Sequence, residues 1–176
     1  MVYPDRIIVL TGLMWAGKSR IGMELAKLLA FPFVDADREI ERAAGITIPE
    51  IFDTYGEEEF RKGEKRVMFR LLSEGPKVLA SGGGAFINPE IRAEIGRRAV
   101  SVWLKADFET LFARVSRTSH RPLLRGDNPA GKLKALMEVR YPVYAEADIM
   151  VETDRQTPHD MAQKVKAALE AFEAGR

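Results

Sequence analysis

Eight residues near the start of the chain have the types and the spacing of a phosphate-binding loop. Residues 12–19 read GLMWAGKS, which matches the pattern G-x-x-x-x-G-K-[ST]. In such a loop the glycines let backbone N–H groups converge on phosphate oxygens. Lys18 would reach the β- and γ-phosphates, and the hydroxyl of Ser19 would hold Mg²⁺. The pattern therefore predicts a site for a nucleoside triphosphate and Mg²⁺.

The residues around this loop supply the elements that must position it. Residues 7–10 are a continuous apolar run, typical of a strand that is buried on both faces. Beyond the loop, Ile21, Leu25, Leu28 and Leu29 recur at helical spacing. The alternative is a chance match in a glycine-rich turn, but strand, turn and helix in this order favour the phosphate loop. We assign the nucleotide phosphates to Gly12, Ala16, Gly17, Lys18, Ser19 and Arg20.

Two acidic residues follow the second predicted strand. Asp35 and Asp37 end the segment 31–37, and in open α/β sheets ligands bind beyond the carboxyl ends of strands. The two side chains would point to opposite faces if both residues were in strand geometry. Asp37 has the alternative role of a helix N-cap, because a charged helical segment begins at Arg38.

Three consecutive glycines, Gly82, Gly83 and Gly84, follow the third predicted strand. Such a run costs chain entropy, and it indicates that another group approaches the backbone closely. A flexible turn is the alternative. The position beyond the carboxyl end of a strand favours a ligand site.

A basic segment with frequent glycine and proline covers residues 114–132. It holds one acid, and its cations are Arg114, Arg117, Arg121, Arg125 and Lys132. In a chain whose charges are otherwise balanced, this composition predicts a mobile lid that binds phosphate. A solvated surface loop is the alternative.

Strand and helix patterns alternate along the whole chain, which predicts one α/β domain over residues 1–176. The predicted strands cover residues 7–10, 31–37, 76–80, 99–104 and 148–151. Capping residues mark several helix starts: Thr47 with Glu50, Asn88, Asp107 and Thr157. We expect a mostly parallel sheet between two layers of helices.

Composition limits the partners and the compartment. The 176 residues include 27 Lys and Arg against 26 Asp and Glu, so no overall charge favours nucleic acid or an anionic membrane. No segment has the length of a membrane span or the pattern of a secretion signal. The chain has no cysteine, which excludes disulfides and thiolate zinc sites. We expect a cytoplasmic protein.

Taken together, several separated motifs make the chain resemble the shikimate kinase family along nearly its whole length. The resemblance is carried by the phosphate loop with Ile21-Gly22, FVDADREIE at 33–41, GEEEFR at 56–61, SGGG at 81–84, RPLL at 121–124 and RYPVY at 140–144. It implies a P-loop fold of the nucleoside monophosphate kinase type, a three-layer αβα sandwich with a five-stranded parallel sheet. It also implies ATP and shikimate as substrates, Mg²⁺ as cofactor and a monomer.

The resemblance implies a role for each acceptor-site position. The acid at Asp37 would bind the ring hydroxyls of shikimate and orient or deprotonate the attacking 3-hydroxyl. Arginines at Arg61 and Arg140 would hold the shikimate carboxylate, and the backbone of Gly82–Gly84 would line the same pocket. Two arginines suit a planar carboxylate, because each guanidinium donates a fork of hydrogen bonds.

The resemblance also implies the nucleotide-side roles. Asp35 would support Mg²⁺ through its water shell, together with Ser19. Arg121 would close over the transferring phosphate, and the catalytic set would be Lys18, Asp37 and Arg121. Arg114 and Arg155 match positions that flank the adenine.

Two residues of the loop depart from the family pattern, and they leave alternatives open. Trp15 stands where the family usually has glycine, and Arg20 where it commonly has threonine. The main hypothesis is an ATP-dependent shikimate 3-kinase. A related small-molecule kinase, such as a gluconate kinase, is a second reading. A degenerate P-loop binding protein is the third, in which Trp15 prevents productive nucleotide binding.

Overall fold

A computed structural model gives the fold of this protein and describes residues 6–117 and 127–176. Five strands form one sheet in the order β2-β3-β1-β4-β5, and every neighbouring pair is parallel. The strands are β1 (Ile7–Thr11), β2 (Phe33–Asp35), β3 (Lys77–Ala80), β4 (Ala99–Lys105) and β5 (Ile149–Glu152). The predicted five-stranded parallel sheet is thereby confirmed.

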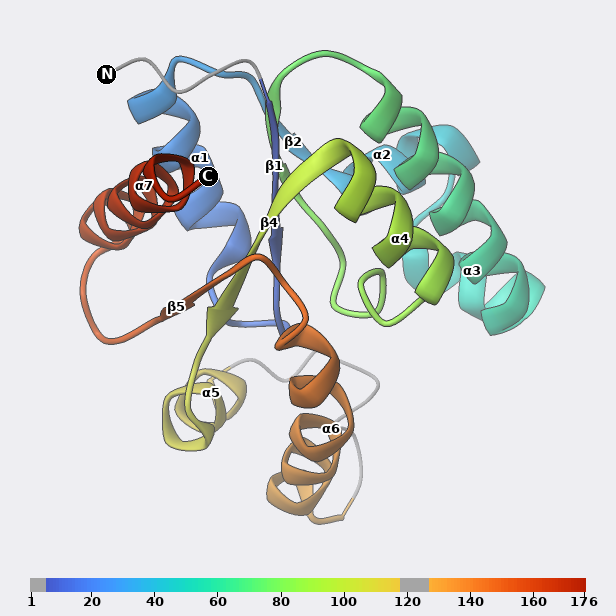
Figure 1. The fold of residues 1–176 in the computed structure, drawn as a ribbon. Helices are drawn as coiled ribbons and strands as arrows, with labels where there is room; N and C mark the ends of the chain where they lie inside the picture. Colours follow the sequence, from blue (N-terminus) through green and yellow to red (C-terminus); the bar gives the residue numbers. More distant parts are fainter. Residues whose placement is uncertain (1–5, 118–126) are drawn as a thin grey trace.

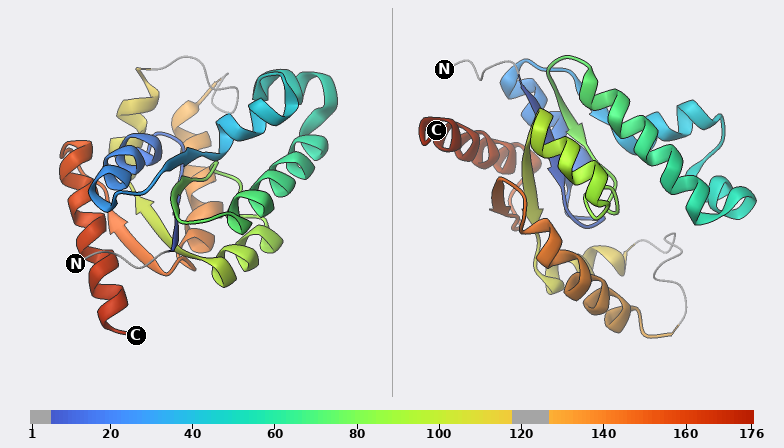
Figure 2. Two further views of the ribbon diagram at one scale, coloured as in Figure 1. Left: turned by 90° about the horizontal axis from the view of Figure 1, so that it is seen from above. Right: turned by 45° about the vertical axis from the view of Figure 1, so that its right-hand side comes forward.

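Helices cover both faces of this sheet (Figures 1 and 2). They are α1 (Lys18–Leu29), α2 (Ala36–Ala44), α3 (Ile48–Ser73), α4 (Pro89–Arg98), α5 (Phe108–Val115), α6 (Pro129–Tyr144) and α7 (Pro158–Ala174). Helices α1 and α7 lie on one face, and α3 and α4 lie on the other, with α2 beside α3. Helices α5 and α6 lie beyond the carboxyl ends of the strands. The arrangement is the predicted three-layer αβα sandwich.

The residues of β1 alternate between two cores. Ile8 and Leu10 belong to the core under α1 and α7, whereas Ile7 and Val9 belong to the core under α3 and α4. All four side chains are buried, as the unbroken apolar run predicted. The central strand is therefore fixed from both sides, and the loop that follows it starts from a rigid point.

Helix caps confirm most of the predicted boundaries. Thr47 and Glu50 form a reciprocal capping box at the start of α3, and Asn88, Asp107 and Thr157 each accept a backbone hydrogen bond at a helix start. Helix α3 is interrupted at Gly56, whose φ of 85° and ψ of 172° lie outside helical geometry. The helix therefore consists of a short first part and a long second part.

The start of α2 differs from the sequence prediction. Strand β2 ends at Asp35 and α2 begins at the next residue, so Asp35 is the N-cap and Asp37 lies in the first helical turn. The predicted extension of this strand to residue 37 and the alternative of Asp37 as the N-cap are therefore wrong. The condition for the two acids to point to opposite faces is not met, because the helix begins between them.

Both ends of the predicted lid are helical. Arg114 is in α5, and residues 129–132 form the first turn of α6. Asn128 caps α6 by accepting a hydrogen bond from the N–H of Gly131 at 3.0 Å. Arg121 and Arg125 lie outside the described residues, and the mobility of the segment stays a prediction.

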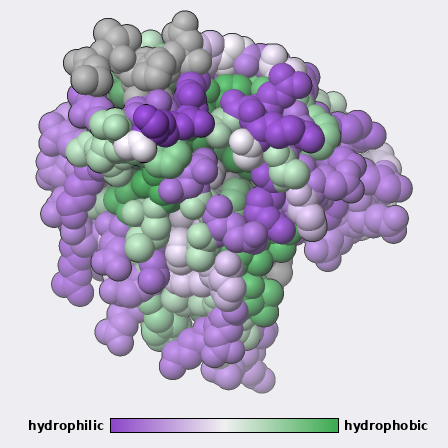
Figure 3. All heavy atoms as spheres, in the orientation of Figure 1, coloured by the Kyte–Doolittle hydropathy of each residue, from purple (hydrophilic) through white to green (hydrophobic). Residues whose placement is uncertain are grey.

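Hydrophilic side chains cover much of the surface in the view of Figure 3, along α3 at the right and around the helix ends below. Within residues 6–117 and 127–176, no helix combines the length and the apolar content that a membrane crossing requires.

Two glycines in helices give a matched test of the packing between α1 and the sheet. A Cβ at Gly22 would lie 2.7 Å from the Phe33 ring and 3.2 Å from Leu10, whereas a Cβ at Gly96 in α4 would meet no heavy atom within 4 Å. Gly22→Ala should lower the free energy of unfolding by about 1–2 kcal/mol, because it overpacks this contact. Gly96→Ala should raise it by up to about 1 kcal/mol. Urea unfolding measures both, and equal stability of the two variants would contradict the packing.

Candidate active site

The loop between β1 and α1 follows a path that requires glycine at two points. Gly12 has a φ of 141°, and a Cβ there would lie 2.8 Å from the carbonyl oxygen of Leu104. Gly17 has a φ of 95° and is the N-cap of α1. A larger residue at Gly12 would collide with β4, and one at Gly17 would be strained. Glycine is thus required at the first and last glycine positions of the motif for two different structural reasons.

The N-terminus of α1 is suited to bind an anion. Among the described residues, no side chain caps this helix, and no acid lies in its first turn. Its first N–H groups and the helix dipole therefore favour a phosphate group. Lys18 is at this end, and its Nζ donates to the Gly12 carbonyl at 2.5 Å. The N–H of Ala16 is already used within the loop, where it donates to the Leu13 carbonyl, and Arg20 is exposed.

Trp15 adopts left-handed geometry with a φ of 65°. A non-glycine residue in this region costs about 1–2 kcal/mol. The indole is half-buried and packs against the core on the α3 side of the sheet, and the Trp15 carbonyl accepts a hydrogen bond from Arg114 of α5. The loop thus accommodates the tryptophan in the geometry that glycine would adopt, and Arg114 lies at the phosphate loop.

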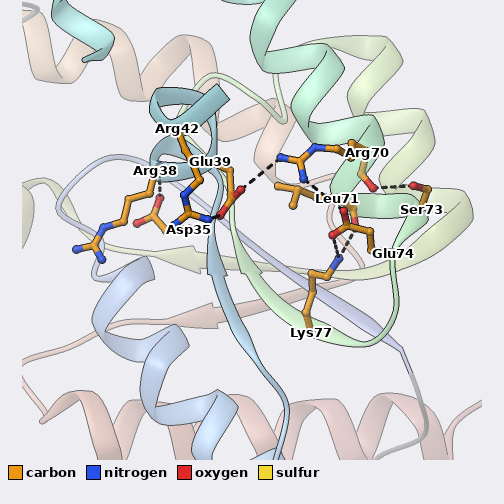
Figure 4. Close-up of polar contacts among 9 residues, drawn as sticks. All are labelled: Asp35, Arg38, Glu39, Arg42, Arg70, Leu71, Ser73, Glu74 and Lys77. Atoms are coloured by element: carbon orange, nitrogen blue, oxygen red, sulfur yellow. Dashed lines mark hydrogen bonds and ion pairs between the residues drawn. The ribbon is translucent and has the colours of Figure 1, made fainter. Parts of the chain in front are cut away.

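Asp35 connects the phosphate loop to α2. Its Oδ2 accepts a hydrogen bond from the Ser19 hydroxyl at 3.0 Å, and its Oδ1 accepts from the N–H groups of Asp37 and Arg38 at 3.0 and 3.4 Å. Figure 4 shows Asp35 and Arg38 at the start of this helix. A hydroxyl and a carboxylate beside a phosphate site fit Mg²⁺, which takes oxygen ligands from one or two protein groups and from phosphates. Within the described residues, no group of three His, Cys, Asp or Glu side chains forms a metal site by itself.

Each residue of the glycine run faces one predicted side chain. A Cβ at Gly82 would lie 2.7 Å from Oδ1 of Asp37, and one at Gly83 would lie 3.0 Å from Nη1 of Arg140. A Cβ at Gly84 would lie 2.5 Å from Nη1 of Arg61. The run therefore lets one carboxylate and two guanidinium groups, from three helices, approach one stretch of backbone.

Glu64 joins this cluster, and the sequence analysis missed it. It is buried, and its Oε1 accepts a hydrogen bond from Nη1 of Arg61 at 2.9 Å. Burial raises the pKa of Glu64; the charge and hydrogen bond of Arg61 oppose this shift, and the nearby Asp37 adds to it. The helical spacing of Phe60 and Val67 could have indicated that Glu64 is buried, because it places Glu64 on the apolar side of α3.

Arg140 of α6 presents an unused donor. Its Nη1 is buried and has no hydrogen-bond partner within the described part of the chain. One turn later, the Tyr144 hydroxyl donates to the Gly83 carbonyl, and burial raises the pKa of Tyr144 to about 12 against the influence of Arg140. A half-buried arginine whose buried Nη1 has no partner among the described residues suits a carboxylate ligand.

Two predicted residues remain, Arg155 and Arg121. Arg155 is exposed. Its charge acts on Asp107, the cap of α5: hydrogen bonds from Thr110 hold the pKa of Asp107 below its usual range, and the charge of Arg155 contributes a smaller part of this lowering. Arg155 therefore lies near the start of α5. Arg121 lies outside the described residues, so the structure neither brings it to the site nor separates it.

A chain of ion pairs fixes α2 against the second part of α3 (Figure 4). Arg70 pairs with Glu39 of α2 at 3.3 Å and with Glu74 at 3.4 Å, and the buried Lys77 pairs with Glu74 at 3.2 Å. An exposed pair such as Arg70–Glu39 stabilises by less than about 1 kcal/mol. It nevertheless joins α2 to α3, the two helices that carry Asp37 and Arg61.

The raised pKa of Glu64 predicts a pH-dependent contribution to stability. The folded state keeps the Glu64 proton to higher pH than the unfolded state, so this residue lowers the free energy of unfolding as pH rises above its ordinary value of 4.5. Glu64→Gln lacks this contribution. The stability of the wild type relative to Glu64→Gln should therefore fall between acidic and neutral pH. Urea unfolding at several pH values measures the difference, and a difference that rises with pH would contradict the shift.

Comparisons with known proteins agree on one family. The family model described as "Shikimate kinase" matches residues 14–170. The shikimate kinase of Caulobacter vibrioides is 57% identical over 167 residues, which are 95% of this chain and 82% of that protein. The structure described as shikimate kinase from Acinetobacter baumannii in complex with shikimate has a TM-score of 0.91 and 39% identity, and covers 96% of this chain and 95% of that one.

A gluconokinase from Sinorhizobium meliloti is more distant. Its structure has a TM-score of 0.63 and 18% identity, and covers 99% of this chain and 97% of that one, so this likeness concerns the fold alone. The family match over most of the chain, together with the close relatives, favours the shikimate kinase family over the gluconate kinases. This chain belongs to the shikimate kinase family.

Proposed function

We propose that this protein is an ATP-dependent kinase that phosphorylates the 3-hydroxyl of shikimate. The observation that carries the proposal is the convergence of Asp37, Arg61 and Arg140 on Gly82–Gly84, next to the phosphate loop. The ligand named for the Acinetobacter baumannii relative supports shikimate as the acceptor.

The acceptor side follows from charge and geometry. Arg61 and Arg140 bind the shikimate carboxylate, and the unused Nη1 of Arg140 supports this assignment. Glu64 holds the Arg61 guanidinium in place. Asp37 orients the 3-hydroxyl, and it accepts the proton as that oxygen bonds to the γ-phosphorus and the bond to ADP breaks.

The donor side uses the loop and the start of α1. The N–H groups there and Lys18 hold the ATP phosphates and stabilise the charge of the transferring group. Ser19 and Asp35 hold Mg²⁺, which neutralises phosphate charge when it is bound. Arg114 and Arg155 flank the adenine, and Arg20 adds a cation near the loop.

We assign residues 114–132 as the lid that closes over ATP, with Arg121 above the transferring phosphate. Closure excludes water, the competing nucleophile. We further propose a monomer that works in the cytoplasm, where ATP and metabolite acceptors are available. Neither nucleic acid nor a membrane takes part in the proposed reaction.

Two other functions have specific observations in their favour. The fold is shared with a gluconokinase, and gluconate also carries a carboxylate that two arginines could bind. The high identity to shikimate kinases favours shikimate as the acceptor. Trp15 favours a degenerate loop, yet within the described residues no side chain caps the start of α1, which weighs against that reading.

The proposal is tested by measuring ADP release from ATP in the presence of Mg²⁺. Three reactions are compared: one with shikimate, one with gluconate and one without an acceptor. We expect release that depends on shikimate. Release with gluconate but not shikimate would establish the second reading, and no release with any acceptor would favour the degenerate loop. The phosphorus–proton coupling in the NMR spectrum of the product identifies the hydroxyl that received the phosphate.

Asp37→Asn tests the acceptor role of this carboxylate. The amide keeps the shape of the side chain but cannot accept the proton as a carboxylate does, so kcat should fall about 100-fold or more while the KM for ATP stays nearly unchanged. Asp53→Asn on the exposed surface of α3 is the matched control and should keep full turnover. Turnover of Asp37→Asn near the wild-type value would remove Asp37 from the catalytic set.

A further inference from the structure

A second cavity, of about 290 Å³, lies between α2 and α3. Its apolar walls include Ile40 and Ile46 on one side and Ile51, Phe60 and Val67 on the other. None of the residues assigned above to shikimate, ATP or Mg²⁺ lines it. Its volume is near the lower end of the range for small-molecule sites, about 300–1,000 Å³, which suits a ligand with a single ring.

The shape of α3 keeps this cavity open. The break at Gly56 separates the first part of the helix, with Ile51 and Tyr55, from the second part, with Phe60 and Gly63. A Cβ at Gly63 would meet one heavy atom, Nη2 of Arg66, at 3.8 Å. A glycine in the wall thus leaves space that an ordinary helical side chain would fill.

The charge at the cavity is unbalanced. Arg66 lines it, and in the described part of the chain this guanidinium forms no ion pair or hydrogen bond. The acid in the lining, Glu59, pairs with Lys62 at 3.2 Å. The cavity therefore offers an uncompensated cation beside an apolar space that includes the rings of Tyr55 and Phe60. This combination is complementary to an aromatic ring that carries a carboxylate.

We propose that this cavity is a second ligand site, which binds a small aromatic carboxylate and thereby changes the affinity for the acceptor. Phe60 provides the physical link, because its ring lines the cavity and the guanidinium carbon of Arg61 lies 5.1 Å from the ring centroid. On the other wall, Ile40 lies one helical turn from Asp37. A ligand that displaces either wall moves a side chain of the acceptor site. This coupling rests on the proposed function, whereas binding at the cavity does not.

Phenylacetate is the probe for binding, and the test uses the full-length protein without ATP or shikimate. In ¹H–¹³C NMR spectra, millimolar phenylacetate should shift the methyl signals of Ile40, Ile46 and Ile51. Arg66→Gln should weaken binding at least fivefold, and Gly63→Leu should abolish it by filling the space. Arg97→Gln, which removes an exposed arginine of α4 that does not line the cavity, is the matched control and should bind as the wild type does.

Three results would overturn the site: no methyl shifts at millimolar phenylacetate, equal binding by all variants, or equal binding of uncharged phenylacetamide. The coupling has its own readout. Phenylacetate should change the shikimate dissociation constant at least twofold, and shikimate should change that of phenylacetate by the same factor. Binding without this reciprocal change would refute the coupling. A lack of kinase activity would leave the methyl shifts unaffected, so the failure of each proposal is distinguishable.

Discussion

The arrangement of the site depends on the hydrogen bonds that the Asp35 carboxylate accepts. One oxygen accepts from Ser19 at the start of α1, and the other accepts from two N–H groups at the start of α2. The same side chain thus sets the phosphate-binding helix and the acceptor helix relative to each other. Phosphoryl transfer depends on positioning far more than on covalent chemistry, so a fixed relation between these two helices has a direct catalytic meaning.

The cluster around the glycine run balances opposing electrostatic effects. Burial of Glu64 disfavours its charged form, and the hydrogen bond from Arg61 offsets part of that cost. Arg140 keeps a buried donor that has no hydrogen-bond partner among residues 6–117 and 127–176. A carboxylate that enters between the two arginines would complete these interactions, so the site is organised before its acceptor arrives.

Sequence patterns predicted the parts of this protein that depend on local chemistry. The apolar run of β1, the phosphate loop and the capping box at Thr47 all follow from residue types at fixed spacing. The pairing of each glycine with one side chain required the packing of three helices, which no local pattern contains. Glu64 was missed because a charged residue within a charged segment is expected to be exposed, and only the packing of the folded protein shows that it is buried. The sequence suggested Asp37 as the alternative helix cap, whereas the early end of β2 makes Asp35 the cap.

The glycine run has a consequence for variants of this protein in a living cell. Added methyl groups at Gly82, Gly83 and Gly84 would each meet first a side-chain atom of a residue assigned to the proposed acceptor site rather than a neighbouring strand. Alanine there would displace Asp37, Arg140 or Arg61. The effect of such variants would fall on the proposed acceptor site rather than on the packing of the sheet. A screen that scores protein levels would therefore classify these three positions as tolerant.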